Sequence, residues 1–562
     1  MAGMEFDYVV VGAGAAGCVV AGRLAAADAR RTVLLIEYGG RGRNPLLHVP
    51  KGFYYTLRGD RYLYRYATNP VGPAGNHEVW LRGRVLGGSA AVNGMMWTRG
   101  APADWDGLAD RGNPGWAWAD VLPAYKAIED HSLGASDLRG GGGPLGVSVT
   151  DPADPVTAAI LESAAKYGWR PVTDVNGSDE ERIGPTPSTI RNGRRTTSYT
   201  AFVRPGPVHR TLAGPTLAGP TPAGPTPAGT ASSGRRANLT VATRTRAVRL
   251  VLEGRRVTGV RVQDSAGAVR DIGARREVIV CAGAIETPLL LERSGIGRPE
   301  VLRAVGIDPV VESPNVGMRL IEQRGVALQV TLKRDIGQAR RLRTWRGRIA
   351  EGIRYLATGR GQLATAGYDL VCQFKSAPGL PRPDIHGLFA PLALDAASAD
   401  MKLARHPGIL FFGYPIRPLT TSSVHVSGPD PAAPPVVDAR FLEADADREA
   451  VAPVLGIVRE LLATSPVADL VADEEFPGPA VATGEDVIGY SLATGTGVYH
   501  AVGSAAMGPG DGDVTDARLR VRGVSALRIA DVSVLPVQVS GNSAAPAMLV
   551  GYRAADFILA DS

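Results

Sequence analysis

The chain has 562 residues, of which 44% are hydrophobic and 21% are charged, and this is ordinary globular composition. The length exceeds what one hydrophobic core usually serves, so it predicts two or more domains, or one large domain with lobes. The net charge of +6, from 61 basic and 55 acidic residues, is spread along the chain and argues against a nucleic-acid partner. Cys18, Cys281 and Cys372 lie far apart, which argues against a disulfide scaffold and a CxxC metal site.

Signals for export or for membrane insertion are not found in the sequence. No basic segment precedes an apolar stretch at the N-terminus, and glycines interrupt the apolar residues at 8–24. A run of 18 or more residues compatible with lipid is missing as well. We therefore expect a cytoplasmic protein without a membrane span.

The first forty residues predict a strand, a helix and a second strand. Residues 7–11 form a β-branched run, as in a buried parallel strand. The sequence Gly-Ala-Gly-Ala-Ala-Gly follows at 12–17, residues 18–27 favour a helix, and residues 32–36 favour a strand that ends at Glu37. This is a βαβ unit with the dinucleotide-binding fingerprint in its expected context.

Each part of this fingerprint has a physical role. Gly12 permits a tight turn, Gly14 permits close approach of a pyrophosphate, and Gly17 permits close packing of helix and sheet. The helix N-terminus offers free N–H groups, and Glu37 is placed to accept hydrogen bonds from a ribose. A bare structural turn is the alternative. The acidic residue argues against NADP but leaves NAD and FAD open.

Three other stretches have distinct character. Residues 212–230 repeat with a period of five in Pro, Ala, Gly and Thr, so we expect a solvated loop, disordered over 206–234. Residues 239–280 predict strands joined by turns, several of them antiparallel with one wet face. Five arginines surround Trp345 within 340–348. A solvated helix face is the preferred interpretation there, and attraction of an anionic substrate or partner is the alternative.

Further motifs follow the βαβ unit in a fixed order. They are RGRVLGGSAAVNGMMW at 82–97, GAIETPLLLERSGIG at 283–297, YHAVGSAAMG at 499–508, RIADVSVLP at 528–536 and GNSAAP at 541–546. Together with the βαβ unit, this series resembles the glucose-methanol-choline (GMC) family of FAD-dependent oxidoreductases. The likeness is dense at 5–100, 239–320 and 495–560, and thin from 325 to 490.

The resemblance implies an α/β (α+β) fold like that of p-hydroxybenzoate hydroxylase. A Rossmann-like FAD-binding domain would be assembled from three stretches, 1–150, 236–322 and 495–562. A substrate-binding domain with an antiparallel sheet would comprise 151–235 and 323–494. The active site would lie where the flavin ring meets that sheet.

The resemblance also implies roles for individual residues. His500 would be the catalytic base, and Asn542 the second catalytic residue, which in the family is His or Asn. The cofactor-binding positions it implies are Gly12, Ala13, Gly14, Ala15, Gly17, Glu37, Val85, Gly88, Asn93, Gly94, Met95, Ala247, Asp531, Val532 and Asn542. No metal ligand is implied.

Alcohol chemistry explains why these two catalytic positions matter. The carbon-bound hydride goes to the flavin, and the hydroxyl proton needs a base with a pKa near neutrality, about 6.5 for an unperturbed histidine. An amide donor such as Asn542 can hold the substrate oxygen as it gains negative charge.

Departures from the family pattern qualify the resemblance. Val92 stands where some members carry a histidine bonded to FAD, so we expect non-covalent FAD. Glu322-Gln323 replaces a frequent Asp-His pair, and Ala501 replaces the usual proline after the histidine. These changes make it unsafe to infer the substrate from close relatives.

The sequence therefore predicts an FAD-dependent dehydrogenase or oxidase acting on a primary alcohol or a sugar-like hydroxyl. The electron acceptor, oxygen or another, is left open. The alternatives on the same fold are a hydroxynitrile-lyase-like lyase, a flavin photodecarboxylase and a non-catalytic flavoprotein.

Overall fold

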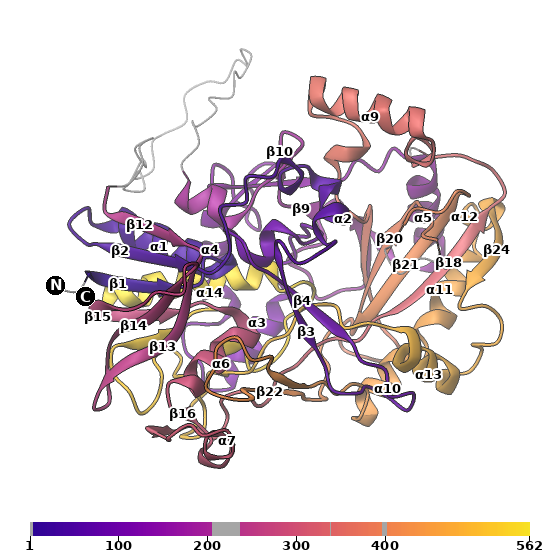
Figure 1. Ribbon diagram of the computed structural model, residues 1–562. Helices are drawn as coiled ribbons and strands as arrows, with labels where there is room; N and C mark the ends of the chain where they lie inside the picture. The colour runs from indigo at the N-terminus through magenta and orange to yellow at the C-terminus, as the bar shows by residue number, and fades with distance from the viewer. Residues whose placement is uncertain (1–3, 205–236, 338, 396–401) are drawn as a thin grey trace.

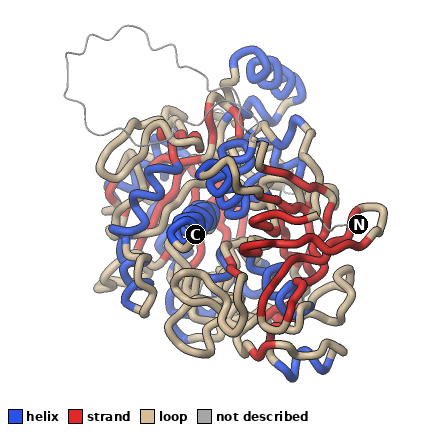
Figure 2. Tube along the Cα trace, turned by 90° about the vertical axis from the view of Figure 1, so that its left-hand side faces the viewer, coloured by secondary structure: helices blue, strands red, loops and turns tan. Residues whose placement is uncertain are grey.

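The computed structural model describes residues 4–204, 237–337, 339–395 and 402–562. The predicted loop at 206–234 lies wholly outside the described residues and is not tested by them. Two large sheets, drawn at the left and right of Figure 1, dominate the structure, and Figure 2 shows the helices and loops around them. The mixed α/β fold class predicted from the sequence is confirmed. The domain boundaries stay a prediction.

The first sheet has the order β12-β2-β1-β15-β14-β13, and β25 (Leu527–Ile529) also pairs with β15. Its parallel part contains β1 (Glu5–Val11), β2 (Val33–Glu37), β12 (Leu239–Thr243) and the end of β15 (Val269–Val280). The long strands β13 (Thr245–Glu253) and β14 (Arg256–Asp264) pair antiparallel with each other, and β14 pairs antiparallel with β15. The antiparallel expectation for 239–280 is confirmed for these pairs. β12 pairs parallel with β2 and the end of β15 pairs parallel with β1, because these segments belong to the nucleotide-binding half of the sheet.

Helix α1 (Ala15–Ala27) packs beside α14 (Ala544–Ala560), so the two ends of the chain meet on one face of this sheet (Figure 1). A Cβ at Gly551 of α14 would lie 2.5 Å from the carbonyl oxygen of Ala16. The close approach of these two helices therefore needs glycine at 551. Other helices around the first sheet are α3 (Pro102–Asp110), α4 (Trp118–Ile128), α6 (Gly283–Arg293) and α7 (Pro299–Ala304).

The second sheet has the order β24-β18-β21-β20-β19-β8-β7 and is antiparallel except for the short pair β7–β8. Its strands are β7 (Arg170–Pro171), β8 (Arg182–Pro185), β18 (Val326–Leu332), β19 (Leu370–Phe374), β20 (Ile385–Ala390), β21 (Gly408–Pro415) and β24 (Val471–Phe476). One face buries apolar side chains against α5 (Pro155–Tyr167), α11 (Val454–Leu462) and α12 (Val467–Leu470), which lie at the right of Figure 1. The opposite face is the one that carries the candidate site described below.

Shorter elements connect the two halves. They include β3 (Leu63–Ala67) with β4 (Val79–Gly83), β5 (Glu129–His131) with β6 (Leu145–Val149) and β9 (Pro187–Ser188), β10 (Ile190–Arg191) with β11 (Arg194–Arg195), β16 (Ile296–Gly297) with β17 (Val311–Glu312), and β22 (Ser423–His425) with β23 (Val436–Asp438). The remaining α-helices are α2 (Phe53–Thr56), α8 (Arg340–Arg343), α9 (Trp345–Thr358), α10 (Asp445–Val451) and α13 (Gly484–Thr494). Within the described residues, no helix is long and apolar enough to span a bilayer.

Gly17 should tolerate substitution less well than Gly14 of the same glycine loop in the flavin-free protein. A Cβ there would lie 1.9 Å from the carbonyl oxygen of Gly12, whereas a Cβ at Gly14 would meet nothing within 4 Å. We expect Gly17→Ala to lower the free energy of unfolding by about 1–3 kcal/mol, the usual cost of overpacking. Gly14→Ala is the matched control and should change it little. Urea unfolding of both apoproteins measures the difference, and equal stability of the two variants would contradict the packing argument.

Candidate active site

The glycine loop between β1 and α1 is closed on its protein side and open on the other. Gly12 has φ +100°, and a Cβ there would lie 2.4 Å from the carbonyl oxygen of Cys281. Gly14 stands at the start of α1, where no side chain caps the helix, and the space around it is open. Ala15 is the first residue of α1. Free N–H groups at this helix end suit a pyrophosphate.

Glu37 ends β2 beside this loop. Its carboxylate accepts hydrogen bonds from the backbone N–H of Ala13, at 3.1 Å, and of Gly39, at 2.7 Å. Burial raises the pKa of Glu37 to about 7, although both N–H donors favour the charged form. Hydroxyl donors from a ribose would add to that stabilisation, so the position fits the role predicted from the sequence.

The stretch 85–95 lies against the glycine loop. A Cβ at Gly88, where φ is +55°, would lie 2.7 Å from the Cα of Gly14. The backbone N–H of Gly87 donates to the carbonyl oxygen of Ala13 at 2.8 Å. Val85 is buried, Gly94 has open space around it, and Met95 has φ +68°.

Asn93 of the same stretch accepts hydrogen bonds through its Oδ1. The donors are the backbone N–H of Met95, at 3.0 Å, and Arg195 Nη1, at 2.8 Å. Asn93 therefore shapes the turn that carries Gly94 and Met95.

The later segments predicted to hold the cofactor reach the same region. Asp531 accepts from the backbone N–H of Gly283, at 2.8 Å, and from Thr287 Oγ1, at 2.6 Å, both at the start of α6. Val532 packs between the apolar clusters of the two sheets. Ala247 is half-buried on β13 and packs against the cluster of the first sheet. The chain thus brings together loops from β1, β15 and β25, which are neighbours in one sheet.

His500 and Asn542, predicted as the catalytic pair, are in direct contact. His500 Nε2 lies 2.9 Å from Asn542 Nδ2. Asn542 is held from behind by Thr98, whose Oγ1 accepts from the backbone N–H of Asn542 at 2.7 Å. Gly541 has φ +102°, and a Cβ there would lie 2.5 Å from Thr98 Oγ1, so the turn before Asn542 needs glycine.

Gln323 determines which nitrogen of His500 carries the proton. Gln323 Nε2 donates to the carbonyl oxygen of Ile416 at 2.7 Å, because a carbonyl can only accept. Gln323 Oε1 therefore faces His500 Nδ1, at 2.9 Å, and accepts a hydrogen bond from its N–H. The lone pair of His500 is then left on Nε2, where Asn542 Nδ2 donates to it.

The imidazole of His500 is neutral in the folded protein. Burial is the main cause, and the positive charge of the nearby Arg82 adds to it, so the pKa falls to about 3. The ordinary value near 6.5, expected from the sequence, therefore does not apply to this environment. The neutral imidazole therefore keeps its Nε2 lone pair unprotonated at neutral pH, with Asn542 as its hydrogen-bond donor.

Glu322 supports the loop of His500 without touching its ring. Its two oxygens accept from the backbone N–H groups of His500, at 2.8 Å, and Ala501, at 3.0 Å. Arg82 lies 3.4 Å from the same carboxylate. Sequence reasoning noted Glu322 and Gln323 only as departures from the family pattern, and it missed that both hold His500 in place.

The second sheet turns one face toward His500. Tyr414 lies edge-on to the imidazole of His500, with ring centroids 5.7 Å apart, and its other neighbour His386 is stacked on it at 5.2 Å. His386, Tyr414 and Gln373 are paired across β20, β21 and β19, so they share a face. The apolar side chains around them are Met96, Val175, Val371, Leu388, Phe412 and Val498.

His386 carries its proton on the opposite nitrogen to His500. Arg182 Nη2, which can only donate, bonds to Gln373 Oε1 at 2.6 Å. Gln373 Nε2 then donates to His386 Nδ1 at 3.3 Å, which leaves an N–H at Nε2. That Nε2 is buried and has no hydrogen-bond partner among the described residues. Burial, with the positive charge of Arg182, lowers the pKa of His386 to about 3, so this donor is uncharged.

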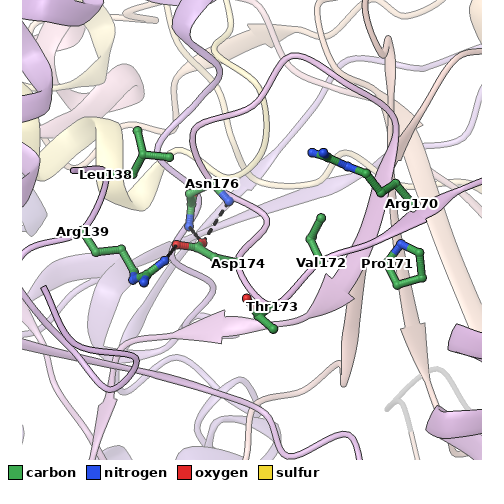
Figure 3. A pocket seen from close by; sticks show the side chains of 8 residues that line it. All are labelled: Leu138, Arg139, Arg170, Pro171, Val172, Thr173, Asp174 and Asn176. Atoms are coloured by element: carbon green, nitrogen blue, oxygen red, sulfur yellow. Dashed lines mark hydrogen bonds and ion pairs between the residues drawn. The ribbon is translucent and has the colours of Figure 1, made fainter. Parts of the chain in front are cut away.

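Two hollows lie outside this cluster. The first, about 460 Å³ and shown in Figure 3, is lined by Leu138, Arg139, Arg170, Pro171, Val172, Thr173, Asp174 and Asn176. Asp174 accepts there from Arg139 Nη1, at 3.2 Å, and from the backbone N–H of Asn176, at 3.0 Å. None of the predicted site residues lines this hollow, and Asp174 links two of its lining residues, Arg139 and Asn176.

The second hollow, about 470 Å³, lies beside the predicted cofactor residues. It is lined by Gly40, Arg41, Gly42, Arg43, Arg61, Tyr62, Thr243 and Arg244. Gly40 forms a β-bridge with Val85. In the described parts of the chain no carboxylate pairs with these four arginines, and their positive charge suits a cofactor that carries phosphates.

Comparison with known proteins places these observations in a family. Models of the GMC oxidoreductase family match residues 6–212 and 231–324, for its N-terminal part, and 418–551, for its C-terminal part. An uncharacterised GMC-type oxidoreductase of Mycobacterium tuberculosis is 34% identical and covers 99% of both chains. The oxygen-dependent choline dehydrogenase of Brucella anthropi is 31% identical over 99% of this chain and 96% of its own.

Solved structures are similar over the whole chain. Pyridoxine 4-oxidase from Mesorbium loti has a TM-score of 0.83 at 26% identity, and covers 98% of each chain. A formate oxidase variant of Aspergillus oryzae RIB40, studied for modification of its FAD, has a TM-score of 0.86 at 25% identity, with 100% of this chain and 99% of the other covered.

Proposed function

The chain belongs to the GMC oxidoreductase family of FAD-binding enzymes, and we propose that it oxidises a small alcohol to the carbonyl compound. The observation that carries this proposal is the contact between His500 Nε2 and Asn542 Nδ2. It supplies a proton acceptor and an amide donor at one point, beside the aromatic face of the second sheet. FAD, when bound, accepts the hydride from the carbinol carbon.

The chain's own residues handle the proton and the oxygen. His500 Nε2 takes the hydroxyl proton, since Gln323 keeps Nδ1 protonated and burial keeps the ring neutral. Asn542 Nδ2 donates to the substrate oxygen as it gains negative charge. An oxygen that replaces the present contact between the two side chains would lie within reach of both nitrogens.

Residues that would hold FAD come from separate segments. The glycine loop and the N-terminus of α1 would bind the pyrophosphate, and Glu37 the ribose. The stretch from Val85 to Met95 would lie along the cofactor, and Asp531 with Val532 near its ribityl chain. The molecule that reoxidises the reduced flavin is oxygen or another electron acceptor, and the alcohol panel described next identifies it.

Anaerobic mixing of the purified protein with a panel of alcohols tests the function. Choline and pyridoxine belong in the panel because relatives and structural neighbours are named for them. Bleaching of the yellow flavin in the dark supports alcohol oxidation, and admission of air or a dye then identifies the acceptor. A lyase, a photodecarboxylase or a non-catalytic flavoprotein would not bleach.

His500→Ala should slow flavin reduction by about 10²–10⁴-fold, the usual contribution of a positioned base. FAD should still bind, because the glycine loop and Glu37 are unchanged. Asn542→Ala should also slow the reaction, and Asn542→His should keep part of it. Stopped-flow absorbance with the best alcohol of the panel measures all of these rates.

The pH dependence gives a second readout of the same base. Because the pKa of His500 is lowered to about 3, the base is protonated and inactive only when the pH falls through that value. We expect the wild-type rate of flavin reduction to be flat between about pH 5 and pH 9. His500→Ala should regain rate at high pH, where the substrate ionises without help. A wild-type rate that decreases as the pH is lowered through about 6.5 would contradict this expectation. It would show that the base has a pKa near the ordinary histidine value.

FAD should be held without a covalent bond to residue 92. Val92 is buried in an apolar cluster with Leu47, Leu63, Val85 and Ala91, and it has no nucleophilic atom. Acid precipitation should therefore release all the flavin into the supernatant. Flavin that stays with the precipitated protein would contradict this prediction.

His386 should favour an alcohol that carries a hydrogen-bond acceptor away from its hydroxyl. Its Nε2–H is buried and unpartnered, and leaving a buried donor unsatisfied costs about 1–3 kcal/mol. Pyridin-3-ylmethanol should therefore reduce the flavin with a higher kcat/KM than benzyl alcohol, which has the same shape. His386→Phe should lower this preference by about tenfold.

Tyr414→Phe is the matched control for His386→Phe, since it removes the other unpartnered polar atom of the same face. It should keep the preference for the pyridine alcohol. If Tyr414→Phe abolished the preference and His386→Phe did not, the donor would be the tyrosine hydroxyl.

A further inference from the structure

Helix α9 (Trp345–Thr358) presents its apolar side chains to solvent. Trp345 is 67% exposed, Ile349 54%, Ile353 63% and Leu356 84%. Their spacing of four, four and three residues places them on one side of the helix. We call these four residues the apolar stripe. The usual orientation of a surface helix, with its apolar side toward the core, is reversed here.

The other side of α9 makes polar contacts with the segments that flank it in the chain and with Gly193. Glu351 is buried and accepts from Arg341 Nη1, at 3.0 Å, and from the backbone N–H of Gln362, at 3.0 Å. Tyr355 Oη donates to the carbonyl oxygen of Gly193 at 3.0 Å. The orientation of the helix is thus fixed by specific bonds, and the stripe is not free to turn inward.

The stripe lies in the most basic part of the sequence. Residues 340–360 contain seven arginines and one acidic residue, Glu351, a net charge equal to the +6 of the whole chain. Arg340, Arg346 and Arg360 form no ion pair with any described carboxylate. The sequence-based expectation of a solvated arginine face is therefore incomplete, because the exposed side of the helix is apolar and is flanked by unpaired positive charge.

We propose that α9 docks the protein on the surface of an anionic lipid membrane. A tryptophan and aliphatic side chains on one side of a helix, with arginines beside them, are the chemistry that binds the boundary between lipid headgroups and acyl chains. In Figure 1, α9 stands out from the body at the top of the molecule, so it can lie flat on a plane. This docking needs no membrane-spanning helix.

A second copy of the chain fits the stripe less well. Four side chains expose a few hundred Å² at most, whereas a stable interface buries about 800 Å² on each partner. A symmetric helix pair would also bring the unpaired arginines of both copies toward each other. The helix belongs to residues 325–417, which neither family model matches.

Sedimentation of the flavin-loaded, full-length protein with vesicles tests the proposal without any substrate. Vesicles of equal parts phosphatidylglycerol and phosphatidylcholine should bind it, and vesicles of phosphatidylcholine alone should bind it about tenfold less. Raising the salt concentration should weaken the binding, because the charges are exposed. No binding to the anionic vesicles would overturn the proposal.

Substitutions in α9 locate the contact. Ile349→Ser combined with Ile353→Ser, and separately Arg340→Glu combined with Arg346→Glu, should each weaken vesicle binding by about tenfold. Leu419→Ser is the matched control, because Leu419 is similarly exposed but lies outside α9. These side chains are on the surface, so the melting temperature should not change. Unchanged vesicle binding in both double variants would show that another surface makes the contact.

The oligomeric state shows whether a second copy of the chain, instead of a membrane, covers the apolar stripe. Analytical ultracentrifugation without vesicles should give the same mass for the wild type and for Ile349→Ser/Ile353→Ser. A wild-type dimer that dissociates in this variant would assign the stripe to a second copy of the chain and overturn the proposal.

Discussion

The carbonyl oxygen of Ile416 can only accept a hydrogen bond, and the chemistry of the candidate site depends on that fact. It fixes the amide of Gln323, the amide fixes the proton on His500 Nδ1, and the lone pair of His500 is left on Nε2. Each step uses a group whose donor or acceptor role cannot change or has already been fixed. The site can therefore present the Nε2 lone pair to Asn542 without a charged group bonded to the ring.

In the second sheet a glutamine amide of fixed orientation also sets the tautomer of a histidine, but here the proton is on Nε2. Arg182 can only donate, so Gln373 turns its amide nitrogen toward His386, and His386 presents an N–H. Tyr414 lies between the two imidazoles, 5.2 Å from one ring centroid and 5.7 Å from the other. One aromatic residue thus separates the histidine that offers a lone pair from the histidine that offers a hydrogen-bond donor. Both histidines are neutral mainly because they are buried.

Local sequence signals were sufficient for part of this structure. The βαβ unit could be predicted because glycine spacing and β-branched runs act within a few residues, and Gly12 and Gly17 meet the backbone contacts that such spacing requires. Motif resemblance across the chain pointed to His500 and Asn542 as catalytic residues, and the structure brings the two into contact. The hydrogen-bond chain from Arg182 through Gln373 to His386 could not be predicted. It depends on the register of β8, β19 and β20, which no sequence motif marks. The exposure of the apolar side of α9 could not be predicted either. The number of arginines in a segment does not show which side of the helix faces water.

The position of Glu322 allows His500 to be held in place and still remain neutral. A carboxylate on Nδ1 would orient the imidazole but would also raise its pKa, so that Nε2 would carry a proton when a base is needed. The chain places the neutral amide of Gln323 on the ring and directs the carboxylate of Glu322 to the backbone N–H groups of His500 and Ala501. The negative charge then stabilises the loop and pairs with Arg82, while the ring keeps a low pKa. The replacement of a frequent Asp-His pair by Glu322-Gln323 is therefore compatible with His500 acting as a base, since it separates the residue that positions the loop from the residue that sets the tautomer.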